Sequence, residues 1–142
     1  MIGQVAAAFV GTVTFALMCG VPWKYRLCCG ICGGAGWWLY MVLSQRGCTP
    51  TETTFFATVL VIVLSRYFAV LGRCPATVFV ISGIIPLVPG AGIYWMAYYL
   101  VMDQQDVALA HGFAAVKTAV AIVLGIVVVF ELPQRLFRVR RE

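Results

Sequence analysis

The sequence IPLVPGAG occupies residues 85–92, in the middle of a 27-residue segment (76–102) that contains no charged side chain. A segment of this length and polarity is long enough to cross a bilayer as a helix. Pro86 and Pro89 interrupt that helix, because proline lacks the backbone N–H and clashes with the carbonyl four residues earlier. The sequence therefore predicts two half-helices, about residues 77–85 and 91–102, joined by unwound backbone at membrane depth.

Unwound backbone inside a membrane has a structural cost, because its polar groups cannot bond to water there. It is tolerated where protein buries it or where it lines a cavity, and many transporters bind substrates at such discontinuous helices. The second half-helix begins near Gly90, Ala91 and Gly92, where free N–H groups and the positive end of the helix dipole attract anions. The alternative is a packing kink whose freed groups are satisfied by neighbouring helices.

The composition of the whole chain is that of an integral membrane protein. Of 142 residues, 63% are hydrophobic and 11% are charged, and the mean hydropathy is +0.98; soluble domains carry about 25% charged residues. The net charge of +5 comes from short loops and a tail beside apolar runs, which is typical of membrane topology. We therefore expect no nucleic acid partner, no metal, no cofactor and no enzymatic activity.

Apolar runs predict an all-α polytopic membrane protein with about five transmembrane helices, the fourth broken at Pro86–Gly92. The runs cover residues 2–19, 27–43, 53–71, 76–102 and 107–130, and each is close to the length of a bilayer crossing. The first run lacks a basic start and a small-residue cleavage site, so we expect it to be retained. Residues 1–132 are thus predicted to form a transmembrane domain, followed by a basic cytoplasmic tail at 133–142.

Loop charges predict the orientation in a cell inner membrane. In a five-span topology Arg46 stands alone on one side. Seven basic residues share the other side: Lys24, Arg26, Arg73, Arg135, Arg138, Arg140 and Arg141. The positive-inside rule then places the N-terminus outside and the C-terminus in the cytoplasm. The same asymmetry favours one crossing with a break over a hairpin that returns to its starting side.

Lys117 is the most unusual residue, because it lies ten residues into the predicted fifth span. That depth is about 15 Å at 1.5 Å per residue, where a lysine facing lipid costs about 2.5–3.5 kcal/mol. No carboxylate of this chain is expected at that depth, so an anionic substrate or an acid from another chain is the expected partner, and snorkelling is the alternative. Arg66 is interpreted as a snorkelling cation and His111 as a capped interfacial histidine.

Cys29 and Cys32 form a Cys-x-x-Cys pair, which is also found in thiol oxidoreductases. Packing is the favoured interpretation, because Gly30 and Gly34 make a GxxxG pair and no histidine or acid nearby completes a zinc set. Small residues recur at the same spacing in the first and fifth spans and predict close helix contacts, including one with a partner: Gly3, Ala7, Gly11, Ala121 and Gly125.

The broken segment resembles the threonine/serine exporter family. The resemblance rests on PATVF at residues 75–79 and GIIPLVPGAGIY at residues 83–94, together with Val21-Pro22 and Gly36-Trp37. It covers nearly the whole chain, and the chain is similar to the small five-span subunit of a split, two-component exporter of the succinate-exporter type. This resemblance implies a hetero-oligomer with a larger exporter subunit of the same family, without which the small subunit does not transport.

Together these features predict the small membrane subunit of a secondary exporter of small carboxylate metabolites, either a succinate-like dicarboxylate or threonine and serine. Lys117, the single deep cation, tilts the prediction towards a dicarboxylate. Export is expected to be driven by a proton or sodium gradient, since no nucleotide-binding motif is present. The alternatives are a non-transporting assembly subunit and a membrane thiol oxidoreductase. The candidate substrate contacts are Pro86, Pro89, Gly90, Ala91, Gly92, Tyr94 and Lys117.

Overall fold

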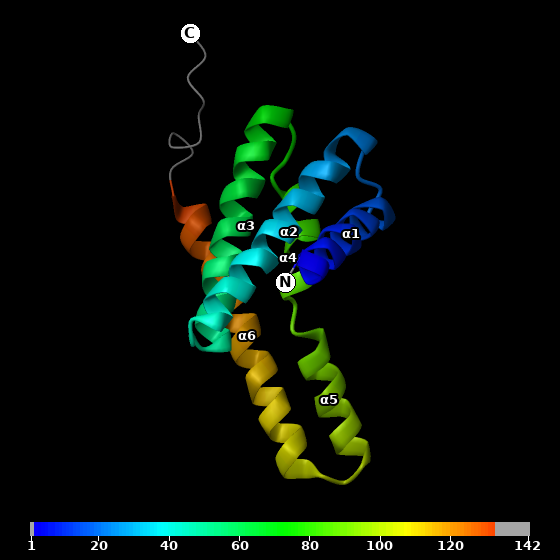
Figure 1. Ribbon diagram of the computed structural model, residues 1–142, viewed down its shortest axis with the longest axis vertical. Helices are drawn as coiled ribbons and strands as arrows, with labels where there is room; N and C mark the ends of the chain where they lie inside the picture. The colour runs from blue at the N-terminus through cyan, green and yellow to red at the C-terminus, as the bar shows by residue number, and fades with distance from the viewer. Residues whose placement is uncertain (1, 133–142) are drawn as a thin grey trace.

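The computed structural model describes residues 2–132, and Figure 1 shows them as a set of packed helices without strands. The helices are α1 (Ile2–Met18), α2 (Trp23–Gln45), α3 (Pro50–Gly72), α4 (Thr77–Ile84), the short 3-10 helix η1 (Ile85–Leu87), α5 (Gly90–Val101) and α6 (Gln105–Glu131). By length and apolarity α2, α3 and α6 can each span a membrane, α4–η1 and α5 form a bent pair, and α1 is a shorter apolar helix. The predicted all-α fold with about five membrane helices is confirmed, while the predicted tail at 133–142 lies outside the described residues.

The broken span has the form that its prolines predict. Residues of α4–η1 and of α5 form two helical pieces that meet at an angle of 48°. Val88 between them has an extended backbone with φ −61° and ψ 131°. A bend of this size keeps both pieces running in the same general direction, so the chain continues through the break rather than turning back (Figure 1).

The glycines of α2 let its neighbours approach closely on two sides. A Cβ atom on Gly33 would lie 2.1 Å from Thr12 Oγ1 of α1, and a Cβ on Gly36 would lie 2.4 Å from Val61 Cγ2 of α3. Neither distance is possible for a real side chain, so both contacts require glycine. The packing interpretation of the small residues on α2 is therefore confirmed.

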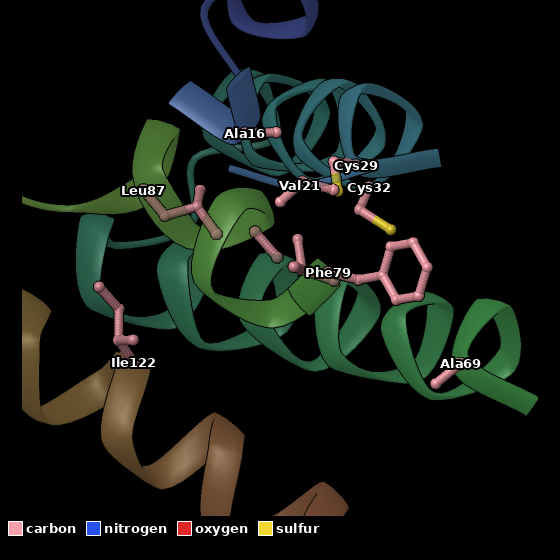
Figure 2. Packing of buried hydrophobic residues seen from close by; sticks show 10 residues of the cluster. Ala16, Val21, Cys29, Cys32, Ala69, Phe79, Leu87 and Ile122 are labelled. Carbon is pink, nitrogen blue, oxygen red and sulfur yellow. The ribbon is translucent and has the colours of Figure 1, made fainter. Parts of the chain in front are cut away.

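The hydrophobic core lies where α2, α3 and α4 meet (Figure 2). Cys29 and Cys32 are fully buried in it beside Phe79, and all three side chains have 0% exposure. Leu87, from the break itself, is 5% exposed and belongs to the same cluster. The two cysteines are thus packing residues, and the break is anchored to the core through Leu87.

Two contacts fix the register between α3 and α6, which run side by side in the same direction. A Cβ on Gly125 would lie 3.0 Å from Thr58, and Val129 packs in one cluster with Ile62. The two residues of each pair are equally far apart in sequence. Counting the same number of residues back from Lys117 leads to Pro50, the first residue of α3, so Lys117 and Pro50 lie at the same level. Residues 105–116 of α6 therefore extend past the start of α3 by about 18 Å at 1.5 Å per residue. Figure 1 shows α5 and α6 running together beyond the α2–α3 turn.

Candidate functional site

The break in the fourth span lines a cavity of about 330 Å³ between α2, α3 and α6. We call this cavity the break pocket. Four of the predicted substrate contacts line it: Pro86, Pro89, Ala91 and Gly92. The break therefore borders a cavity, which is one of the surroundings in which unwound backbone is tolerated in a membrane protein.

The backbone of the break supplies hydrogen-bond donors to the pocket. Gly90 N–H donates to the Val88 carbonyl at 2.7 Å, and Ile93 N–H donates to the Pro89 carbonyl at 3.2 Å. Between them, Ala91 and Gly92 follow in the first turn of α5, where backbone N–H groups have no acceptor within their own helix. Both N–H groups belong to the first turn of α5, where the helix dipole is positive. This side of the pocket is therefore suited to a carboxylate.

The same break also supplies hydrogen-bond acceptors. Pro89 has no N–H, so it cannot satisfy a carbonyl in the preceding turn. The carbonyls of Pro86 and Leu87 stand at the end of η1, where the last carbonyls of a helix have no donor within it. The two residues line the pocket together with Ala91 and Gly92. Donors and acceptors thus lie in one neutral stretch of backbone.

Side chains from three other helices complete the pocket, and Tyr40, Thr54 and Thr118 among them were not predicted from the sequence. Tyr40, from α2, stacks on Trp37 with ring centroids 5.1 Å apart. Thr54 of α3 donates its hydroxyl proton to the Pro50 carbonyl at 2.8 Å, and Thr118 of α6 donates to the Ala114 carbonyl at 3.0 Å. Each threonine oxygen still has lone pairs that can accept a hydrogen bond. In the sequence, the feature that could have identified these residues is that each is a hydroxyl side chain within an apolar run.

The pocket is electrically neutral among the residues that the structure describes. Its lining contains no aspartate, glutamate, lysine or arginine. Its polar groups are backbone N–H and carbonyl groups, the Trp37 indole and the hydroxyls of Tyr40, Thr54 and Thr118. It can therefore orient a small polar solute by hydrogen bonds without adding a net charge.

Three predicted contact residues lie elsewhere. Gly90 is exposed, and a Cβ atom there would meet nothing within 4 Å. Tyr94 is 62% exposed and stacks with Tyr98 along α5. Lys117 lies on a different face of α6, in a groove shared with α3. The structure therefore does not bring Lys117 to the break pocket.

The expected surroundings of Lys117 were wrong in one respect. No carboxylate of this chain was expected at its depth, but Glu52 lines the same groove. The reason is the register of α6 on α3, which brings Lys117 level with the first turn of α3. No ion pair joins the two side chains within residues 2–132.

Arg66 caps a helix instead of snorkelling to the membrane surface. It is 7% exposed and donates to the carbonyls of Val129 and Leu132 at the end of α6. Its guanidinium also lies 5.5 Å from the centre of the Phe130 ring. A cation at the C-terminal end of a helix is stabilised by the helix dipole, which accounts for this inward position.

His111 holds α5 against α6 in the hairpin that these two helices form, near its exposed end. Its ring stacks on Tyr99 with centroids 5.5 Å apart and an interplanar angle of 9°. Close by, a Cβ on Gly112 would lie 2.8 Å from Met96 Sδ. The α5–α6 contact thus uses glycine and stacked rings, and it positions the start of α5 beside the pocket.

The comparisons with known proteins agree with this architecture. The family model described as "Threonine/Serine exporter, ThrE" matches residues 4–131. Neither the search of curated proteins nor the search of solved structures found a match. The family match runs from the first turn of α1 to the end of α6 and includes the broken span and every residue of the break pocket. The chain belongs to the threonine/serine exporter family and is a multi-pass membrane protein of transporter type.

Proposed function

We propose that this chain is the small subunit of a secondary exporter and that the break pocket binds its substrate, a small metabolite with a carboxylate group. The observation that carries the proposal is that the N–H groups at the start of α5, the carbonyl groups at the end of η1 and a cavity coincide at one proline–glycine break. Discontinuous helices supply substrate sites in this way in other transporters. Membership of an exporter family supports the transport role.

The chemistry of the pocket favours threonine and serine over a dicarboxylate. A zwitterionic amino acid carries no net charge, so its carboxylate can accept from the N–H groups of Ala91 and Gly92 while its ammonium donates to the carbonyls of Pro86 and Leu87. A dicarboxylate would bring two negative charges into a pocket whose described lining has no cation to pair with them, and burying unpaired charges is costly. The prediction of a dicarboxylate substrate from the sequence depended on Lys117, and Lys117 lies in another groove.

We infer that a larger subunit of the same family completes the transport path. Helix α5 has no buried residue, and its apolar side chains are strongly exposed, Val101 at 84% and Leu100 at 57%. A partner helix packed on α5 would close the pocket from the side that this chain leaves open. A succinate-like substrate would need a cation from that partner. The inner-membrane location, the external N-terminus and a proton or sodium gradient as the energy source are parts of the same proposal.

The test is export of isotope-labelled threonine, serine and succinate from proteoliposomes that contain this chain, the larger subunit or both. We expect threonine and serine export only with both chains. Ala91→Leu should fill the pocket and abolish export, while Ile93→Leu, which places the same side chain on an exposed face, should leave it unchanged. Full export by the larger subunit alone, or by the Ala91→Leu variant at equal protein level, would instead support a non-transporting assembly subunit.

A further inference from the structure

A second and larger groove lies between α3 and α6, and the proposed transport function does not use it. Its volume is about 770 Å³, and Glu52, Phe55, Phe56, Lys117, Val120 and Leu124 contribute to its walls. We call it the α3–α6 groove. It shares no lining residue with the break pocket, so whatever occupies it binds independently of the substrate.

Two opposite charges stand in this groove. Lys117 is exposed and forms no hydrogen bond or ion pair with any residue between 2 and 132. Glu52 is held in place by a capping box, in which its Oε2 accepts from Thr49 N–H at 3.0 Å and its own N–H donates to Thr49 Oγ1 at 3.4 Å. The carboxylate keeps a second oxygen for another donor. The groove therefore presents one cation and one fixed anion that do not neutralise each other by direct contact.

The remainder of the groove is apolar and runs away from these charges along α6. Val120 and Leu124 follow Lys117 by one and two turns on α6, and they are 51% and 52% exposed. Phe56, on the α3 side, is 53% exposed. Together they form an apolar strip about 10 Å long at 1.5 Å per residue. An occupant must therefore have a charged end and an apolar end.

The position of the charges relative to the membrane identifies the polar end of that occupant as a headgroup. Helix α3 has 23 residues, which is about 34 Å and close to the thickness of a bilayer. With its first turn, including Glu52, at the boundary between hydrocarbon and water, the register of α6 puts Lys117 at the same level and the α5–α6 hairpin beyond that boundary. The apolar strip runs from there into the membrane, as a lipid does.

We propose that the α3–α6 groove binds one aminophospholipid of the phosphatidylethanolamine class. The lipid phosphate pairs with the Lys117 ammonium, the headgroup ammonium pairs with the Glu52 carboxylate, and one acyl chain lies along Phe56, Val120 and Leu124. This occupant satisfies both charges. An anionic lipid without an amine would bring its charge next to Glu52, and a helix carrying one acid would pair with Lys117 alone.

The test is native mass spectrometry of the full chain, purified with its partner where they associate, stripped of lipid and titrated with three lipids of identical acyl chains. The lipids are phosphatidylethanolamine, phosphatidylglycerol and phosphatidylcholine. We expect one saturable site that prefers phosphatidylethanolamine, and Lys117→Ala should weaken its binding about tenfold, as expected for the loss of one charged contact. Arg46→Ala removes a cation from the turn between α2 and α3, which is close to the start of α3 but outside the groove. This control variant should leave lipid binding unchanged.

Glu52→Gln provides the sharper variant, because glutamine also fits a capping box and so preserves the start of α3. It should retain lipid binding while losing the preference for phosphatidylethanolamine over phosphatidylglycerol. Equal binding of all three lipids to the unmodified protein, or an unchanged preference in Glu52→Gln, would overturn the proposal. A photo-reactive residue in place of Val120 should form lipid adducts in native membranes, and adducts with a protein chain in their place would also refute it.

Discussion

Gly92 lies directly against Ala115, so that a Cβ atom on Gly92 would be 3.3 Å from the Ala115 Cβ. Both residues also line the break pocket. A close contact between α5 and α6 therefore lies at the wall of the proposed substrate site. Any change in the size of this pair alters the packing of the hairpin and the shape of the pocket together.

Exchanging the two residues tests this relationship. Gly92→Ala adds a methyl group to a tight contact and should destabilise the protein by about 1 kcal/mol, with reduced export. Adding Ala115→Gly should restore both stability and export, because the pair then regains its total volume. The measurements are thermal unfolding in detergent and labelled threonine export. Additive losses in the double variant would show that the two residues do not act as a packing pair.

Arg66 should be a stability residue rather than a transport residue. Arg66→Met removes the donors to the carbonyls of Val129 and Leu132, and hydrogen bonds to a charged group contribute about 1.5–3 kcal/mol. We expect a loss of about 2 kcal/mol in the free energy of unfolding. Arg66→Lys keeps the charge at the end of the α6 dipole but loses the planar fork, so its loss should be smaller. Equal losses in both variants would mean that the charge contributes nothing.

The sequence predicted the broken span well, because proline chemistry is local. Pro86 and Pro89 disrupt an α-helix whatever surrounds them. Helix α4 ends at Ile84, one residue before the predicted end, η1 continues the first piece to Leu87, and α5 begins at Gly90, one residue before the predicted start. The glycine face of α2 was predictable for a similar reason, since the spacing of small residues marks a helix contact.

The position of Lys117 was not predictable in this way. The length of an apolar run gives the number of crossings, but not how far one helix is shifted along another. That shift is fixed by contacts between distant residues, such as Gly125 with Thr58 and Arg66 with the end of α6. The pocket residues Tyr40, Thr54 and Thr118 were missed for the same reason, because three separate helices bring them to the break.

Thr58 offers a way to stabilise the protein. Its hydroxyl oxygen is buried and has no hydrogen-bond partner among the described residues, and such a group costs about 1–3 kcal/mol. Thr58→Val has nearly the same shape and should raise the free energy of unfolding by about 1 kcal/mol. The control is Thr53→Val, because the Thr53 hydroxyl is also buried but donates to the Thr49 carbonyl at 2.7 Å. If Thr53→Val raised the free energy of unfolding by the same amount, the stabilisation would come from the added hydrophobic side chain and not from removal of an unpaired hydroxyl.

Cys29 and Cys32 provide the test of the thiol oxidoreductase alternative. Both side chains are fully buried in the core, whereas Cys19 is exposed. In the folded protein a membrane-permeant maleimide should therefore label Cys19 rapidly and the buried pair only after denaturation. Cys29→Ala and Cys32→Ala each remove a buried sulfur and should lower the free energy of unfolding by about 1 kcal/mol. Export measured at equal protein level should persist, because neither thiol lines the break pocket. Rapid labelling of Cys32 in the folded state, together with loss of activity in Cys32→Ala, would favour the redox function over transport.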